Sequence, residues 1–277
     1  MYETCPNCGS DFLKRTIEDN EVMYSCVNCD WYKVEQEPFL LGMWGITIRQ
    51  ALAPIDILHS LLTAPDIVGF LRPRLKGVSY LSQAGAARKF TVESDKYLLG
   101  EIDIAHQVYL RQMIVLAATY LELILKDFFL SFFIAKPSRM NQVLSTTGKG
   151  EAVVSLNELL STETKEELVM KLAQRAAGIK GSGEPDKILR TLVNECKVKL
   201  EGPIIDNVRL LKEQRNRIVH EETQEDIDIK QVLDSFGTIE YFLYVLAEIA
   251  KNYDVPYLDD EGFLSSFENR MKKYEQP

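Results

Sequence analysis

The chain has 277 residues, of which 46% are hydrophobic and 26% are charged. These are ordinary values for a globular protein, and the length suggests one main domain with one or two smaller pieces. The formal net charge of -9 argues against indiscriminate coating of nucleic acid, which needs many basic side chains against phosphates. It leaves room for a small, locally basic site.

The N-terminal segment carries two C-x-x-C pairs, formed by Cys5, Cys8, Cys26 and Cys29. Zn²⁺ takes four tetrahedral ligands, and two intervening residues let one tight turn present both thiolates to the metal. The stretch between the pairs reads as two strands joined by turn residues. Residues 1–36 therefore resemble a zinc ribbon, a small β-hairpin unit holding one structural Zn²⁺. Four thiolates leave no open position for catalysis, and the alternative of a redox dithiol pair would need a βαβ pattern that is missing.

The start of the chain shows no basic segment followed by an apolar run, so we expect no signal peptide and a cytoplasmic protein. The apolar stretch from Met113 to Ala135 contains Glu122, Lys126 and Asp127. Each charge near a bilayer centre costs about 2.5–3.5 kcal/mol, so a helix buried in a protein core is expected there instead of a membrane span.

Residues 37–94 contain several prolines and glycines, which we expect to interrupt every periodic stretch, Pro54 among them. The pattern predicts a connector with short helices, one from Gln50 to Leu62 and another opening at Pro65. Strands are expected only in the N-terminal unit.

Helical periodicity dominates residues 95–253, which we expect to form the main, all-α domain. The predicted helices run from about Ser94 to Phe133, Lys165 to Ala177, Pro185 or Asp186 to Cys196, Ile204 to His220, and Asp226 or Asp228 to Tyr253. Gly202-Pro203 is expected to separate the third helix from the fourth. A loop is expected from Gly178 to Pro185. Residues 254–277 are predicted to form a polar C-terminal tail that frays.

The helix ending at His220 carries an unusual combination of side chains. Arg215 falls in the middle of an apolar stripe, which is formed by Ile204, Val208, Leu211, Ile218 and Val219. An arginine there must meet an anion or a partner, because burial of an unpaired charge is costly. Asn216 and His220, four residues apart, share the adjacent flank of the helix.

Arg215-x4-His220, with Asn216 after the arginine, resembles the R-x4-6-H signature of HEPN domains. The helical layout of residues 95–253 is similar to the four- to five-helix HEPN bundle, to which the zinc ribbon does not belong. The resemblance implies a metal-independent endoribonuclease whose two motifs face each other across a homodimer cleft. It also implies a toxin or a phage-defence protein, with a neutralising antitoxin or defence partner.

The chemistry fits these residue types. RNA supplies its own nucleophile, the 2′-hydroxyl, and a histidine such as His220 can move a proton to or from the reacting oxygens. Arg215 can brace the phosphorane with paired hydrogen bonds, and Asn216 can orient His220 or bind phosphate. The product would carry a 2′,3′-cyclic phosphate.

Non-catalytic interpretations of these residues stay open. Arg215 could pair with a buried carboxylate such as Glu122 and simply tie helices together. HEPN domains also include inactive members that serve as interaction modules, here with a ribbon that binds nucleic acid or protein, and a fold does not establish an activity. An unrelated helical protein is a third reading. His59 and His106 are predicted to be structural residues without a matching partner.

Overall fold

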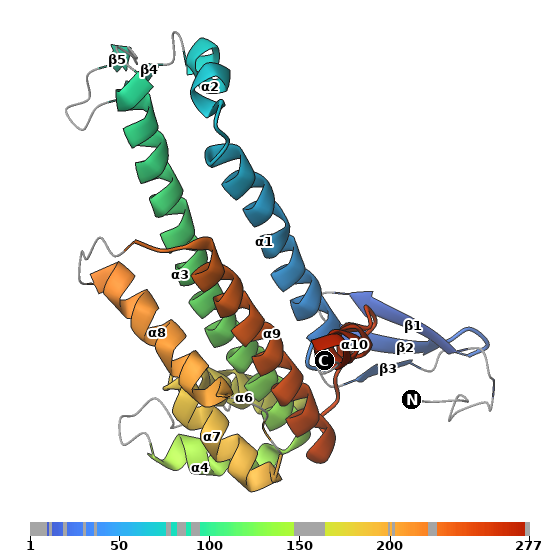
Figure 1. Cartoon of the computed structure of the whole chain (residues 1–277). Coiled ribbons are helices and arrows are strands. Elements are labelled where there is room, and N and C mark those ends of the chain that lie inside the picture. The colour runs from blue at the N-terminus through green and yellow to red at the C-terminus, as the bar shows by residue number, and fades with distance from the viewer. Residues whose placement is uncertain are drawn as a thin grey trace. The chain divides into compact units, whose positions relative to one another are not determined.

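A computed structural model describes residues 10, 13–18, 21–29, 32–35, 38–75, 79–81, 87–89, 95–146, 164–198, 200, 203–220 and 226–274. The helices are α1 (Leu41–Leu62), α2 (Ile67–Leu75), α3 (Asp95–Ala135), α4 (Met140–Thr146), α6 (Lys165–Gly181), α7 (Pro185–Cys196), α8 (Ile204–His220), α9 (Ile229–Asn252) and α10 (Phe263–Tyr274). The strands are β1 (Leu13–Glu18), β2 (Glu21–Cys26), β3 (Tyr32–Glu35), β4 (Ser79–Leu81) and β5 (Ala87–Lys89). Figure 1 shows the dominance of helices, so the prediction of a mainly α fold is confirmed.

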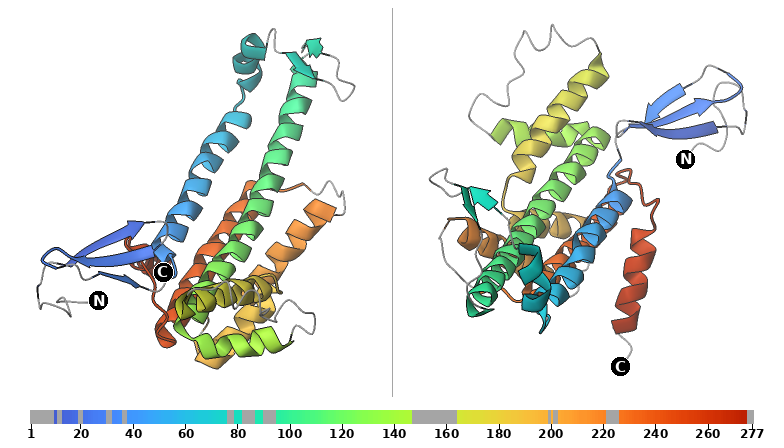
Figure 2. Two further views of the ribbon diagram at one scale, coloured as in Figure 1. Left: turned by 180° about the vertical axis from the view of Figure 1, so that it is seen from behind. Right: turned by 90° about the horizontal axis from the view of Figure 1, so that it is seen from above.

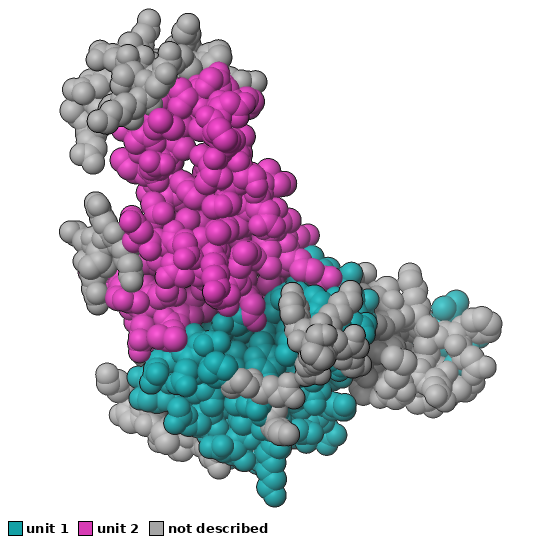
Figure 3. All heavy atoms as spheres, viewed as in Figure 1, with its two compact units in different colours: residues 1–46, 119–209, 238–277 teal, residues 47–118, 210–237 magenta. Residues whose placement is uncertain are grey.

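The chain divides into two compact units (Figure 3). Unit 1 comprises residues 1–46, 119–209 and 238–277, and unit 2 comprises residues 47–118 and 210–237. Helices α1, α3, α8 and α9 contribute residues to both.

The strands β1, β2 and β3 form an antiparallel sheet in that order, seen from two further sides in Figure 2. β1 pairs with β2 in a register that sets Leu13 opposite Cys26, and β2 pairs with β3. β1 and β2 occupy the segments in which the sequence predicts two strands, whereas β3 was not predicted. The prediction that strands are confined to this region is wrong, because β4 and β5 pair in unit 2.

The beginning of α1 is fixed within unit 1 by backbone and side-chain contacts. Phe39 is fully buried, its N–H donates to the carbonyl of Pro256 over 2.9 Å, and its carbonyl accepts from Leu258 over 2.9 Å. The carboxylate of Asp127 accepts from the Leu40 N–H over 3.3 Å and from the Trp44 indole N–H over 2.8 Å. These contacts explain why the helix starts at Leu41, well before the predicted start at Gln50.

Pro54 lies inside α1 and does not interrupt it, so that prediction is wrong. A proline in a helix interior removes one backbone hydrogen bond and disfavours the helix by about 3 kcal/mol. The neighbouring Ile48 and Ile55 are fully buried, and burial of each such side chain contributes about 1.5–3 kcal/mol. Tertiary packing therefore outweighs the local effect of the proline.

The core of unit 1 is rich in aromatic rings from the C-terminal half of α3. The ring of Phe128, fully buried, contacts Phe39 and Phe129 edge-on at centroid distances of 5.6 and 5.5 Å. It also stacks on Phe132 at 6.0 Å. Phe129 stacks on Phe133 at 5.6 Å. The apolar run that the sequence places in a protein core is buried as expected.

The C-terminal segment contains a helix where the sequence predicts a fraying tail. α10 places Phe263 and Phe267 in the interior, with 1% and 6% of their surfaces exposed. Arg270 forms a paired contact with the carboxylate of Glu240, with both N–O distances at 3.0 Å. The prediction failed because it was based on the mostly polar composition of this segment. The two aromatic residues that anchor the helix, Phe263 and Phe267, were not recognised as an apolar face.

Gly45 on α1 lies against Phe263, and a β-carbon at this position would approach the ring to 2.6 Å. We expect Gly45→Ala to lower the free energy of unfolding by about 1–3 kcal/mol, the usual cost of overpacking. Gly178 on α6 has open space around the same position, so Gly178→Ala should raise stability by up to about 1 kcal/mol through helix propensity. Chemical denaturation of both variants measures the difference, and equal effects would contradict the packing described here.

No helix in the described ranges is long and apolar enough to cross a membrane.

Candidate functional site

Helix α8 has the bounds that the sequence predicts, Ile204 to His220. Ile204, Val208 and Leu211 are buried, with 3% or less of their surfaces exposed. The predicted apolar stripe does not continue to the end of the helix, because Ile218 is only partly buried and Val219 is 47% exposed. The last turn of α8 therefore presents both apolar and polar side chains to solvent.

Arg215 and Asn216 form a direct pair in this last part of α8. A guanidinium N–H of Arg215 donates to the side-chain oxygen of Asn216 over 3.0 Å, and both residues are partly buried. Within the described part of unit 2, no carboxylate lies within ion-pair distance of Arg215. The remaining guanidinium donors can therefore serve an external anion, to which arginine binds in a fork geometry.

His220 is the last residue of α8, and its side chain is exposed. Among the described residues, no hydrogen bond joins it to Arg215 or Asn216. The pairing of Asn216 with Arg215 thus takes the place of the expected orienting contact between Asn216 and His220. The exposed imidazole of His220 is a candidate for contact with a bound molecule.

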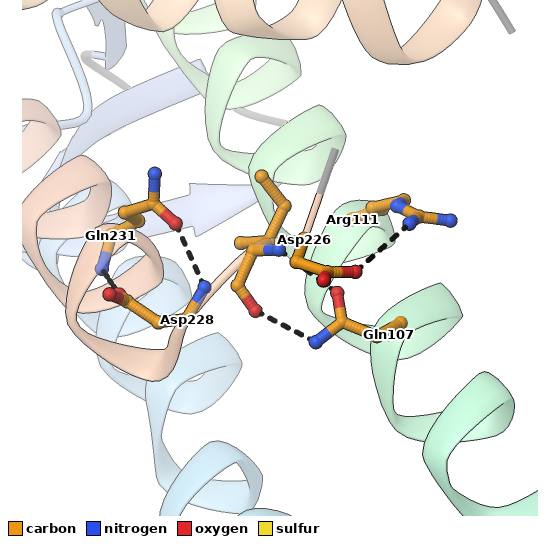
Figure 4. Close-up of polar contacts among 6 residues, drawn as sticks. Gln107, Arg111, Asp226, Asp228 and Gln231 are labelled. Carbon is orange, nitrogen blue, oxygen red and sulfur yellow. Dashed lines mark hydrogen bonds and ion pairs between the residues drawn. The ribbon is translucent and has the colours of Figure 1, made fainter. Parts of the chain in front are cut away.

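The chain that follows the motif is anchored to α3 within unit 2 (Figure 4). The side-chain amide of Gln107 donates to the Ile227 carbonyl over 3.1 Å and accepts from the Ile227 N–H over 2.9 Å. Arg111, one turn further along α3, faces the exposed carboxylate of Asp226 at 4.0 Å. The two-way contact of Gln107 fixes the backbone, whereas so exposed an ion pair contributes little.

Helix α9 begins with a reciprocal cap, also visible in Figure 4. The Asp228 carboxylate accepts from the Gln231 N–H over 2.7 Å, and the Gln231 side chain accepts from the Asp228 N–H over 2.8 Å. Such a capping box satisfies two backbone donors that a helix start leaves open. Of the two residues that the sequence offers as the start of this helix, Asp228 is the cap.

His59 and His106 lie against each other in unit 2, so the prediction that they lack a partner is wrong. His59 on α1 and His106 on α3 approach to 3.1 Å between Nδ1 and Nε2, and their ring centroids are 5.1 Å apart. Both side chains are partly buried. Helical periodicity places each histidine on a helix face but gives no information on which residue it meets across helices.

Burial of His106, together with its contact with His59, predicts a pH dependence of stability in unit 2. Burial lowers the pKa of His106 below its ordinary value of 6.5, and the charge of His59 lowers it further, while Asp103 opposes the shift. The unfolded chain then binds more protons than the folded one at mildly acid pH, so the contribution of His106 to stability is present above about pH 6.5 and is lost below it.

We therefore expect the free energy of unfolding to fall between pH 7 and pH 5.5, and His106→Gln to reduce that fall. Denaturation curves over this range provide the measurement. His220→Gln is the control, since it removes an exposed histidine and should leave the slope in place. An unchanged slope in His106→Gln would show that other groups carry it.

The cysteine-bearing region is described in part. Cys26 is buried, Cys29 is partly buried, and the N–H of Asn28 between them donates to the Cys26 sulfur over 3.4 Å. The Asn28 side chain donates to the Ser10 hydroxyl over 2.8 Å. Cys5 and Cys8 lie outside the described residues, in which no group of three or more histidine, cysteine, aspartate or glutamate side chains could hold a metal.

A cavity of ≈ 270 Å³ lies in unit 1, away from the predicted site residues in sequence. Its lining combines the rings of Phe129, Phe132 and Phe133 with the charged side chains of Arg139, Lys180 and Glu195. The rings are at least 94% buried, and aliphatic side chains, among them Ile179 and Leu192, also line the cavity.

Comparisons with protein-family models, curated proteins and solved structures find no match to this chain. The residues themselves therefore carry the functional argument. Gln107 and Arg111, which hold the segment after the motif, were not singled out from the sequence. Nothing in the sequence distinguishes them from the other polar residues of α3, such as Asp103 and Gln112.

Proposed function

We propose that this protein is a metal-independent endoribonuclease of the HEPN type. One observation supports the proposal above all others: the last turns of α8 combine an exposed His220 with an Arg215 whose only described partner is the neutral Asn216. A proton-transfer group and a cation thus occur close together in sequence on one helix end. The HEPN resemblance assigns these residue types to RNA cleavage.

In the proposed reaction, the 2′-hydroxyl of RNA attacks the adjacent phosphorus, and the 5′-oxygen leaves. A neutral imidazole accepts the 2′-hydroxyl proton, and a protonated one donates to the 5′-oxygen. Arg215 stabilises the extra negative charge of the phosphorane. One histidine in a chain cannot hold both protonation states at once, which favours a cleft shared by two chains.

The surface of α8 supports such a homodimer. Val219, which directly precedes His220, is 47% exposed. The second chain would cover this apolar side chain and contribute its own Arg215 and His220 to the site.

We further propose that Cys5, Cys8, Cys26 and Cys29 hold a structural Zn²⁺. The N–H of Asn28 directed at the Cys26 sulfur is the kind of contact that stabilises a metal-bound thiolate. The hydrogen bond from Asn28 to Ser10 brings the second cysteine pair close to the residue that follows Cys8-Gly9. The metal would fix the fold of this segment and take no part in the reaction.

The proposal is tested with the purified full chain and a single-stranded RNA in the absence of added divalent metal. We expect cleavage products that end in a 2′,3′-cyclic phosphate. DNA of the same sequence is the matched control and should remain intact, because it lacks the 2′-hydroxyl. Cleavage of both polymers, or products ending in a 3′-hydroxyl, would exclude this mechanism.

The alternative is a catalytically inactive HEPN-like interaction module. The exposed Val219 also favours it, since an apolar side chain at the end of α8 suits a protein partner without any chemistry at His220. An intact homodimer that cleaves no RNA would support this reading. Growth restriction and a neutralising partner, which the HEPN resemblance implies, belong to the nuclease proposal and are tested by expression in a host cell.

A further inference from the structure

The contact between His59 and His106 has a geometry suited to more than one hydrogen bond. Two helices of unit 2 that run in opposite directions, α1 and α3, each contribute one imidazole (Figure 1). His59 Nδ1 and His106 Nε2 point at each other over 3.1 Å, and the ring planes are inclined by 44°. Both nitrogens can therefore approach a common point between the helices.

We propose that His59 and His106 form a binding site for a divalent transition-metal ion such as Zn²⁺, which would join α1 to α3. Histidine nitrogens bind Zn²⁺ at about 2.0–2.1 Å, so two nitrogens 3.1 Å apart subtend an angle of roughly 100° at the metal. This value lies between the angles of octahedral and tetrahedral coordination. Because the two nitrogens point at each other, each ring would turn by roughly 40° to direct its lone pair at the ion.

The protonation states also suit a metal. In the neutral pair, one of the two facing nitrogens carries the proton of the N–H···N bond. On metal binding, that proton is lost from the facing nitrogen while the opposite nitrogen of the same ring takes one up, so no net charge change is needed. Among the described residues, those opposite nitrogens, His59 Nε2 and His106 Nδ1, have no hydrogen-bond partner that would oppose the change of tautomer.

The surroundings of the pair are partly enclosed. Both histidine side chains are partly buried, and Asp103 lies one turn before His106 on α3. No third histidine, cysteine, aspartate or glutamate within the described ranges completes the group, so the remaining coordination positions would be open to water. Such a site exchanges its metal more readily than four thiolates do.

The site would be independent of the proposed nuclease. Its residues lie on α1 and α3, whereas Arg215 and His220 lie on α8. A bound ion would stabilise unit 2 by linkage, because it binds the folded pair and not the separated histidines of the unfolded chain.

The test is a calorimetric titration with Zn²⁺ of the 277-residue chain, purified with any tightly held zinc in place. We expect one additional Zn²⁺ per chain and a rise in the unfolding temperature. In His106→Gln and in His59→Gln the affinity should fall by roughly tenfold or more, since loss of even an outer partner of a metal ligand commonly costs 10–100-fold. His220→Gln is the matched control and should keep the additional site.

A second measurement covers the case in which a variant fails to fold. Histidine-ring NMR signals of the unaltered protein, which has three histidines, should shift for His59 and His106 on addition of Zn²⁺ and remain in place for His220. Equal affinity in all three variants, or a shift confined to His220, would overturn the proposal. Because neither readout involves RNA, the result is independent of whether the protein is a nuclease.

Discussion

Replacement of His220 by alanine should lower the rate of RNA cleavage by roughly 10²–10⁴-fold, the usual contribution of a general acid or base. The side chain is exposed at the end of α8, so its loss should leave the fold intact. The measurement compares initial cleavage rates of the two proteins on the same RNA, with circular dichroism as a check on folding. Equal rates would remove His220 from the mechanism.

Two arginine variants of α8 sharpen this result. Arg215→Ala should fold normally and lose activity, because no carboxylate in the described part of unit 2 pairs with Arg215. Arg209→Ala is the matched control: Arg209 lies on the same helix, is exposed and forms an ion pair with Asp206 at 3.2 Å. Its loss should change the rate little. A loss of stability of several kcal/mol in Arg215→Ala alone would favour a buried ion pair instead.

Phe128→Ala should lower the free energy of unfolding by about 3–5 kcal/mol, the range for removal of a fully buried aromatic ring. Phe128 has no exposed surface and contacts three other rings of unit 1. The variant would leave a cavity that these rigid rings cannot fill by small movements. Urea denaturation with far-ultraviolet circular dichroism gives the difference.

Leu123→Ala on the same helix provides the comparison. Leu123 is 42% exposed, and substitutions at such positions usually change stability by less than about 0.5 kcal/mol. A comparable loss in both variants would mean that the effect comes from the helix as a whole and not from the aromatic cluster around Phe128.

Local signals in the sequence were sufficient to predict the helices whose starts are marked by proline. α8 was predicted with its observed bounds because Gly202-Pro203 precedes an apolar stripe, and α7 because Pro185 suits the first turn of a helix. α6 extends four residues beyond the predicted end at Ala177, to Gly181, since glycine lowers helix propensity without excluding a helix.

Contacts between distant segments could not be predicted from these signals. The start of α1 depends on Asp127, which is 87 residues away from Leu40. The contact between His59 and His106, and that between Gln107 and Ile227, likewise join separate helices or segments. Periodicity identifies the face on which a side chain lies but not its partner. For the same reason two roles stayed open for Asn216 in the sequence analysis, and its hydrogen bond with Arg215 was not predicted.

The hydrogen bond between Trp44 and Asp127 makes tryptophan fluorescence a reporter of the start of α1. Burial raises the pKa of Asp127, while the hydrogen bonds from Trp44 and Leu40 partly offset that shift. Protonation of the carboxylate would weaken both contacts and change the electric field at the indole ring. Fluorescence from Trp44, followed as the pH falls, would therefore record the release of the first turn of the helix inside the intact molecule.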